Sequence, residues 1–76
     1  MNKQRRADLQ RAKALIEEAQ TIVAQAAEDE QEYFDNMPES LQGGDKGQAA
    51  EQVAMDLDDM ASRLEDLASE VEEATQ

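Results

Sequence analysis

Apolar residues in the first half of the chain recur at alternating intervals of three and four. The series consists of Leu9, Ala12, Ile16, Ala19, Val23, Ala26, Tyr33 and Met37, with Glu30 as its one interruption. This spacing keeps one side of an α-helix apolar, as the a and d positions of a coiled coil do. Leu15 and Ile22 lie beside the series and widen it. Because the residues between are mostly good helix formers, the pattern predicts a helix over residues 4–35.

A second series with the same spacing follows in the last third of the chain. It consists of Ala50, Val53, Leu57, Met60, Leu64, Leu67, Val71 and Ala74. Three alanines repeat every seven residues beside it, namely Ala54, Ala61 and Ala68. Asp45, followed three residues later by Gln48, has the form of a capping box and marks a helix start. The pattern predicts a second helix over residues 46–74.

Residues 36–45, here called the corner, separate the two predicted helices and hold the only proline and two of the three glycines. A residue before proline is pushed out of the α region. We expect Asn36 to cap a short turn that Leu41 anchors, and the Gly43–Gly44 pair to let the chain reverse.

Each predicted helix carries a wider apolar side than one partner helix would cover. A chain of 76 residues without cysteine has no disulfide to compensate for a small core, and such chains usually need partners. We therefore predict a single all-α domain over residues 1–76, an antiparallel helical hairpin that self-associates into a four-helix bundle. A homodimer is the expected form, with a higher oligomer as the alternative.

Charge is distributed unevenly along the chain. The net charge is −12, yet five of the seven basic residues lie within residues 1–13. An antiparallel hairpin would bring this basic tip beside the acidic end of the second helix. The pairing would join Arg5, Arg6, Arg11 and Lys13 to Glu65, Asp66, Glu70, Glu72 and Glu73. The negative charge argues against nucleic acid and anionic membranes as direct partners. With neither a membrane-spanning run nor a signal-peptide core, we expect a cytoplasmic protein.

The corner also carries a motif. It reads Asn36-Met37-Pro38-Glu39-Ser40-Leu41-Gln42, preceded by Tyr33-Phe34-Asp35 and followed by Gly47-Gln48-Ala49. In these residues the chain resembles small acidic helical proteins encoded by phages and prophages, in which a heptad-rich segment runs into an N-(L/M)-P-E-(S/N)-L-Q corner and a second acidic helix. The resemblance implies a viral origin, a hairpin fold and action in the host cytoplasm. Most members carry no assigned activity.

The expected function is non-catalytic protein binding, with inhibition of a host protein as its concrete form. The corner is the candidate recognition loop, because it offers polar groups beside apolar ones. Its candidate residues are Asn36, Met37, Pro38, Glu39, Leu41 and Gln42. The alternative explanation is a connector whose apolar residues plug the end of the bundle and whose polar residues cap it.

Three other functions stay open. A nucleic-acid mimic that blocks a nuclease or defence complex would use spaced carboxylates, with Asp56, Asp59, Asp66, Glu70 and Glu73 as candidates. A protein that sequesters a small phosphorylated ligand would use the basic tip, with Arg5, Arg6, Arg11 and Lys13 as candidates. A structural scaffold would need no such site. Each charged group also has an explanation without a ligand: the carboxylates would form a solvated surface, and the basic tip would form ion pairs across the hairpin.

Catalysis is the least expected function. The chain has no histidine and no cysteine, which removes the usual neutral-pH base, the commonest zinc ligand and the thiolate nucleophile. Its clustered carboxylates, such as Asp56, Asp58 and Asp59, fall on what the pattern predicts to be an exposed helix surface. We expect no enzyme activity, no cofactor and no metal site.

Overall fold

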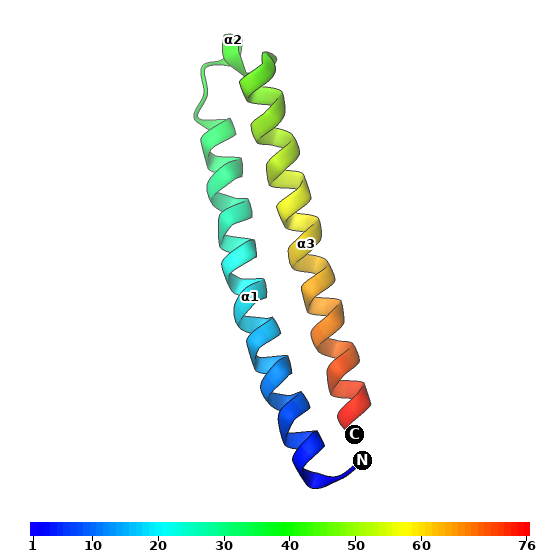
Figure 1. The fold of residues 1–76 in the computed structure, drawn as a ribbon. Coiled ribbons are helices and arrows are strands. Elements are labelled where there is room, and N and C mark those ends of the chain that lie inside the picture. Colours follow the sequence, from blue (N-terminus) through cyan, green and yellow to red (C-terminus); the bar gives the residue numbers. More distant parts are fainter.

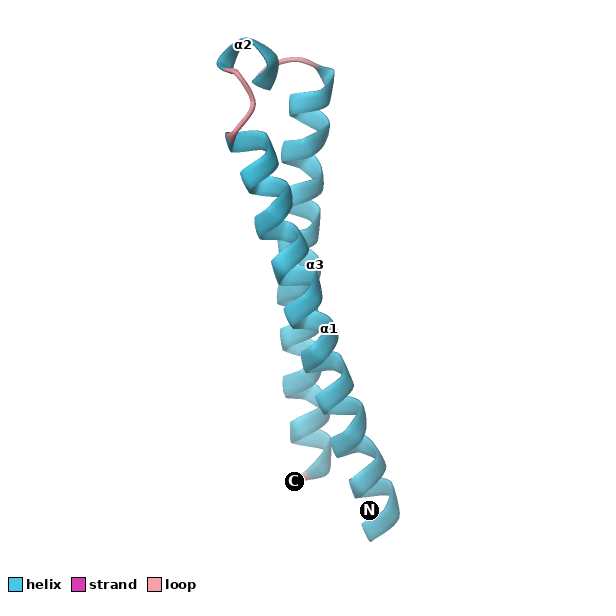
Figure 2. Ribbon diagram, turned by 90° about the vertical axis from the view of Figure 1, so that its left-hand side faces the viewer, coloured by secondary structure: helices cyan, strands magenta, loops and turns pink.

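The chain folds into a rod of two long antiparallel helices, here described by a computed structural model of all 76 residues. Helix α1 spans Lys3–Asp35, the single turn α2 spans Glu39–Gln42, and α3 spans Asp45–Thr75. The rod measures 59 × 13 × 13 Å, and both termini lie at the end away from α2, here called the open end (Figure 1). Seen from the side, α1 and α3 cross at a shallow angle (Figure 2). The predicted all-α antiparallel hairpin is confirmed.

Helix α1 begins one residue earlier than predicted because Asn2 caps it. The Asn2 side-chain oxygen accepts a hydrogen bond from the backbone N–H of Arg5 at 2.7 Å. An asparagine at this position satisfies one of the free N–H groups of the first turn.

The contact face of α3 differs from the predicted series. Its buried and half-buried residues before the last turn are Gly47, Ala50, Ala54, Leu57, Ala61, Leu64, Ala68 and Val71. Val53, Met60 and Leu67, which the spacing places against α1, are exposed instead. The alanines that repeat every seven residues take their place. Small side chains let two helices approach closely, so the hairpin closes on the narrow alanine column and leaves the larger side chains outside.

Helix α1 shows the same change toward the corner. Ala27 is buried and Phe34 half-buried, whereas Ala26 and Tyr33, the predicted contact residues, are exposed. A straight α-helix drifts by about 20° per heptad from a strict seven-residue repeat. Over several heptads this drift moves the contact from one residue to the next in sequence. Glu30, the interruption in the series, stays half-buried.

The interior of this rod is thin. Its buried apolar residues are all alanines, and no large side chain is fully buried. Burial of alanine removes little apolar surface from water, and small chains have little stability to spare. The hairpin on its own therefore lacks the core of large side chains that usually stabilises a domain.

At the corner, the backbone of Gln42 packs directly against Gly47. A Cβ added at Gly47 would overlap the backbone carbonyl of Gln42 and lie 2.7 Å from the Gln42 Cα, so only glycine fits there. The Gln42 side-chain amide donates to the Phe34 carbonyl at 3.1 Å, which satisfies a group at the end of α1. The Gly43–Gly44 pair, which we expected to let the chain reverse, has ordinary negative φ angles of −81° at both residues. The glycine that the turn requires is Gly47.

Two predicted caps are wrong. Asn36 ends α1, and its backbone N–H donates to the Glu32 carbonyl at 2.9 Å; Pro38 holds the N-cap position of α2. Asp45 does not form a capping box with Gln48, because α3 has already begun at Asp45. The Gln48 amide instead donates to the Gly43 carbonyl at 3.0 Å.

Candidate functional site

Most of the large apolar side chains that the hairpin leaves exposed lie on one side of it. On α1, Leu15, Ile22 and Tyr33 each precede a contact residue by one position, which places them about 100° around the helix in one sense. On α3, the exposed residues Val53, Met60 and Leu67 stand in the same relation to Ala54, Ala61 and Ala68. Because the two helices are antiparallel, residues that precede the contact residues of α1 and residues that precede the contact residues of α3 lie on the same side of the hairpin. Together with Leu41 of the corner, these residues form the surface here called the apolar face.

Two hollows on the apolar face join residues of different elements. The first, of about 380 Å³, is lined by Val23, Met60, Arg63, Leu64 and Leu67. The second, of about 420 Å³, lies at the corner and is lined by Tyr33, Met37, Leu41, Gly44, Asp45 and Lys46. Both hollows are lined by apolar and charged residues together. The apolar face thus runs from the corner past the middle of the rod.

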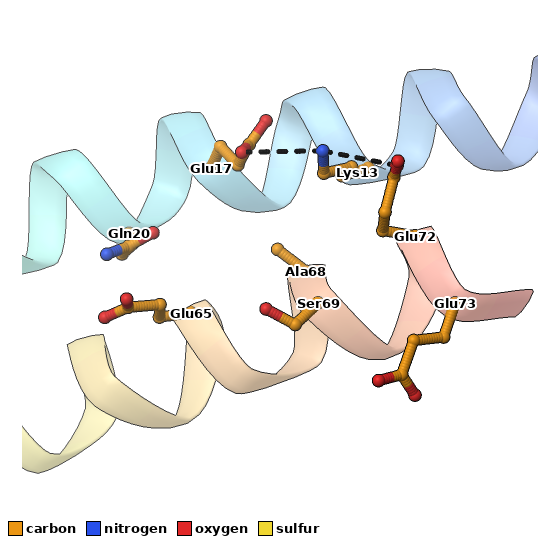
Figure 3. A pocket seen from close by; sticks show the side chains of 8 residues that line it. All are labelled: Lys13, Glu17, Gln20, Glu65, Ala68, Ser69, Glu72 and Glu73. Carbon is orange, nitrogen blue, oxygen red and sulfur yellow. Dashed lines mark ion pairs between the residues drawn. The ribbon is translucent and has the colours of Figure 1, made fainter. Parts of the chain in front are cut away.

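The opposite side of the hairpin is polar toward the open end. A hollow of about 480 Å³ there is lined by Lys13, Glu17, Gln20, Glu65, Ala68, Ser69, Glu72 and Glu73 (Figure 3). Lys13 lies between two carboxylates, 3.3 Å from Glu72 of α3 and 4.0 Å from Glu17 of α1 (Figure 3). With four carboxylates around one ammonium group, the field in this hollow is negative and disfavours an anionic ligand.

The structure does not bring the four phosphate-binding candidates together. Arg6 lies about 100° and Arg11 about 240° around the helix from Arg5, so the three guanidinium groups leave α1 in different directions. None of the three forms an ion pair, and only Lys13 pairs across the hairpin, with Glu72. The predicted neutralisation of the tip is confirmed at that one pair.

The five acidic candidates are exposed along one flank of α3. Asp59, Asp66 and Glu73 are seven residues apart, and Asp56 and Glu70 belong to the adjoining column. Arg63 stands in that column and donates to Asp59 at 2.9 Å. No group of three or more carboxylates converges as metal ligands would.

Some corner candidates have structural roles. Gln42 is half-buried and bonded to Phe34, and the Pro38 carbonyl accepts the backbone N–H of Leu41 at 2.8 Å. Asn36 and Glu39 are exposed, and neither side chain has a hydrogen-bond partner within the chain.

Two of the apolar candidates, Met37 and Leu41, line the same hollow at the corner end of the rod. Met37 is half-buried, and Leu41 is 58% exposed, so a single hairpin leaves the Leu41 side chain open to a partner. Leu41 belongs to the apolar face, and Met37 borders it.

Sequence reasoning missed that the corner and the middle of the rod share one surface. The signal was the run of small residues Gly47, Ala54, Ala61 and Ala68, spaced by seven. Such a column marks where helices approach most closely, and the larger column beside it then has to lie outside.

Comparisons with known proteins give no relative from which a function could be inferred. No family model, curated protein or solved structure matches the chain. Neither α1 nor α3 contains an apolar stretch that could cross a bilayer.

Proposed function

We propose that this chain is a non-catalytic protein-binding module, and that its binding surface is the apolar face. The observation that carries the proposal is the gathering of large apolar side chains. Of the nine that are exposed, all but Met1 and Met55 lie on this face. Monomeric proteins rarely expose contiguous apolar patches of this kind, and such patches mark interaction sites.

The exposed area is large enough to drive association. Full burial of a Leu, Ile or Met side chain contributes about 1.5–3 kcal/mol, so a side chain that is half exposed still has roughly 1 kcal/mol to gain. Seven such side chains offer several kcal/mol to a partner that covers them. Part of that energy offsets the loss of translational and rotational freedom on binding.

The arrangement of polar groups supports a role without catalysis. A catalytic site needs acid, base or nucleophile converging in a sheltered pocket. The polar hollow around Lys13 instead holds ion pairs between partly exposed groups. The proposal includes no cofactor and no metal. The corner motif makes inhibition of a host protein, in the host cytoplasm, its concrete form.

Nucleic-acid mimicry is less well supported than binding through the apolar face. The five acidic candidates span residues 56–73 of α3, about 26 Å at 1.5 Å per residue. Their mean spacing of roughly 6 Å is sparser than the 3.4 Å per charge of a nucleic-acid strand. Arg63 also places a positive charge inside the acidic flank. Sequestration of a phosphorylated ligand lacks support for a different reason, since the basic groups diverge.

A pull-down with two matched variants tests the proposal. Met60 on the apolar face and Met55 on the opposite side belong to the same helix and are 42% and 59% exposed. Met60→Glu and Met55→Glu therefore add the same charge to the same helix on different sides. We expect wild type and Met55→Glu to retain in high salt a protein that Met60→Glu loses, either a protein of a bacterial lysate or an added second copy of the chain. If all three forms capture the same proteins and moderate salt releases them, the proposal is contradicted and binding through the acidic flank is favoured.

A further inference from the structure

We propose that a second copy of the chain covers the apolar face, and that the two hairpins pack with the corner of one beside the open end of the other. The product is a four-helix bundle in which each α1 lies antiparallel to the other α1. This inference rests on the proposed binding role of the apolar face and names its partner.

A second copy supplies the core that one hairpin lacks. The buried apolar residues of the hairpin are alanines, while the large side chains stand exposed in columns beside them. When two apolar faces meet, the columns of Leu15 and Ile22 and of Val53, Met60 and Leu67 become the inner layer of a bundle. The side chains predicted as contact residues on α3 then pack against the other copy. Four-helix bundles are filled in this way.

The apolar face suits a two-fold interface. A homodimer about a two-fold axis uses the same patch on both copies, so the patch has to be complementary to itself. Both helices contribute apolar columns here, and Leu15, Ile22, Met60 and Leu67 surround the middle of the rod. A two-fold axis through that middle lays apolar residues on apolar residues. Charged groups such as Arg63 and Glu70 fall at the edge, where they stay in water.

The distribution of charge along the rod favours one of the two possible orientations of the dimer, with the corners together or apart. The half at the open end, residues 1–21 and 63–76, holds six basic and eight acidic residues, a net charge of −2. The half at the corner, residues 22–62, holds one basic and eleven acidic residues, a net charge of −10. The two halves add to the net charge of −12. One hairpin is thus a rod with nearly all its excess negative charge at the corner.

Two hairpins with their corners together would place −20 at one end of the bundle and −4 at the other. Two hairpins with their corners apart place −12 at each end. Because like charges repel in proportion to their product, the second arrangement has the lower electrostatic energy. It also lays the basic tip, residues 1–13, beside the acidic residues 28–35 of the second copy.

The association state is the first test. Sedimentation equilibrium of the intact chain should give a mass of two 8.4 kDa chains. Met60→Glu should weaken the dimer by at least about tenfold, because it buries a carboxylate, and Met55→Glu should leave it unchanged. Ile22→Glu, on the other helix at a side chain 64% exposed, should act as Met60→Glu does. Added salt should strengthen the dimer, because it screens the repulsion between two chains of charge −12.

The orientation is the second test. The chain has no cysteine, and a Cβ at Gly43 meets no atom within 4 Å, so Gly43→Cys accepts a spin label without disturbing the corner. In the proposed bundle the distance between two labels approaches the 59 Å length of the rod. With corners together it would be on the order of 20 Å, two helix diameters.

The outcomes separate this inference from the proposed function. A short distance between labels overturns the orientation. A monomeric wild type overturns the dimer, and a lysate partner captured through Met60 would then leave the protein-binding role standing. A dimer that Met55→Glu weakens as much as Met60→Glu overturns the assignment of the apolar face, and with it the basis of the proposed function.

Discussion

Replacing Gly47 by alanine is expected to open the corner. The added Cβ would overlap the Gln42 carbonyl and lie 2.7 Å from the Gln42 Cα, whereas ordinary contact begins at 3.4 Å, so the Gln42 backbone has to move by at least about 0.7 Å. Backbone at the end of α2 cannot rotate away as a side chain does. The movement also pulls the Gln42 amide from the Phe34 carbonyl, to which it donates at 3.1 Å.

The net cost of Gly47→Ala follows from three contributions. Overpacking costs about 1–3 kcal/mol. The lost hydrogen bond costs about 1 kcal/mol. Alanine gains about 1 kcal/mol over glycine inside a helix. We expect a net destabilisation of about 2 kcal/mol, which lowers the melting temperature of a domain this size by about 10 °C.

Gly43→Ala is the matched control. Gly43 has a φ of −81°, and a Cβ there would meet no atom within 4 Å, so alanine fits without strain. By restricting the unfolded chain it should stabilise by about 0.4–1 kcal/mol. The assay is urea unfolding followed by far-UV circular dichroism, at one protein concentration because association shifts apparent stability. Gly47→Ala unfolding at the wild-type urea concentration or above would refute the account of the corner.

Two further predictions concern single polar contacts. Gln42→Ala should destabilise by about 1 kcal/mol, because it removes the partly buried side-chain hydrogen bond to the Phe34 carbonyl, which then keeps only backbone donors such as the Met37 N–H; an unchanged urea midpoint would contradict the role of that hydrogen bond. Lys13→Ala should cost less than about 0.5 kcal/mol in low salt and nothing measurable in high salt, because the side chains of the Lys13–Glu72 pair are 30% and 47% exposed and salt screens them. A loss that persists in high salt would contradict a screened surface pair.

The helices and the corner were predictable because their signals are local. The three-and-four spacing of apolar residues and the position of Pro38 fix where helices run and where they stop. Helix α1 differs from its predicted bounds by one residue at its start, and α3 differs by one residue at each end. The preceding Asn2, a local capping signal, accounts for the difference at the start of α1.

The rotation of the contact was not predictable from apolarity alone. Val53, Met60 and Leu67 are more apolar than Ala54, Ala61 and Ala68, so the periodic pattern favours the wrong column. In the structure the alanine column faces α1, because a close approach of two helices needs small side chains. A shift of the contact by one residue along α3 exchanges the two columns.

The hydrogen bonds and packing of the corner could not be predicted, because they join residues that no local sequence pattern connects. Gln42 bonds to Phe34, eight residues earlier, and its backbone packs on Gly47. The ion pair of Lys13 with Glu72 depends on the register between two helices. Such contacts emerge only once the hairpin has formed.

The solvent exposure of the methionine methyl groups tests the central claim, that a partner covers the apolar face. The chain has four methionines, so a methyl spectrum holds one signal for each. Met60 and Met55 are 42% and 59% exposed in the hairpin. With a soluble paramagnetic agent at high protein concentration, the account predicts that Met60 stays sharp and Met55 broadens, and that dilution exposes Met60. Equal broadening of both signals at every concentration would contradict it.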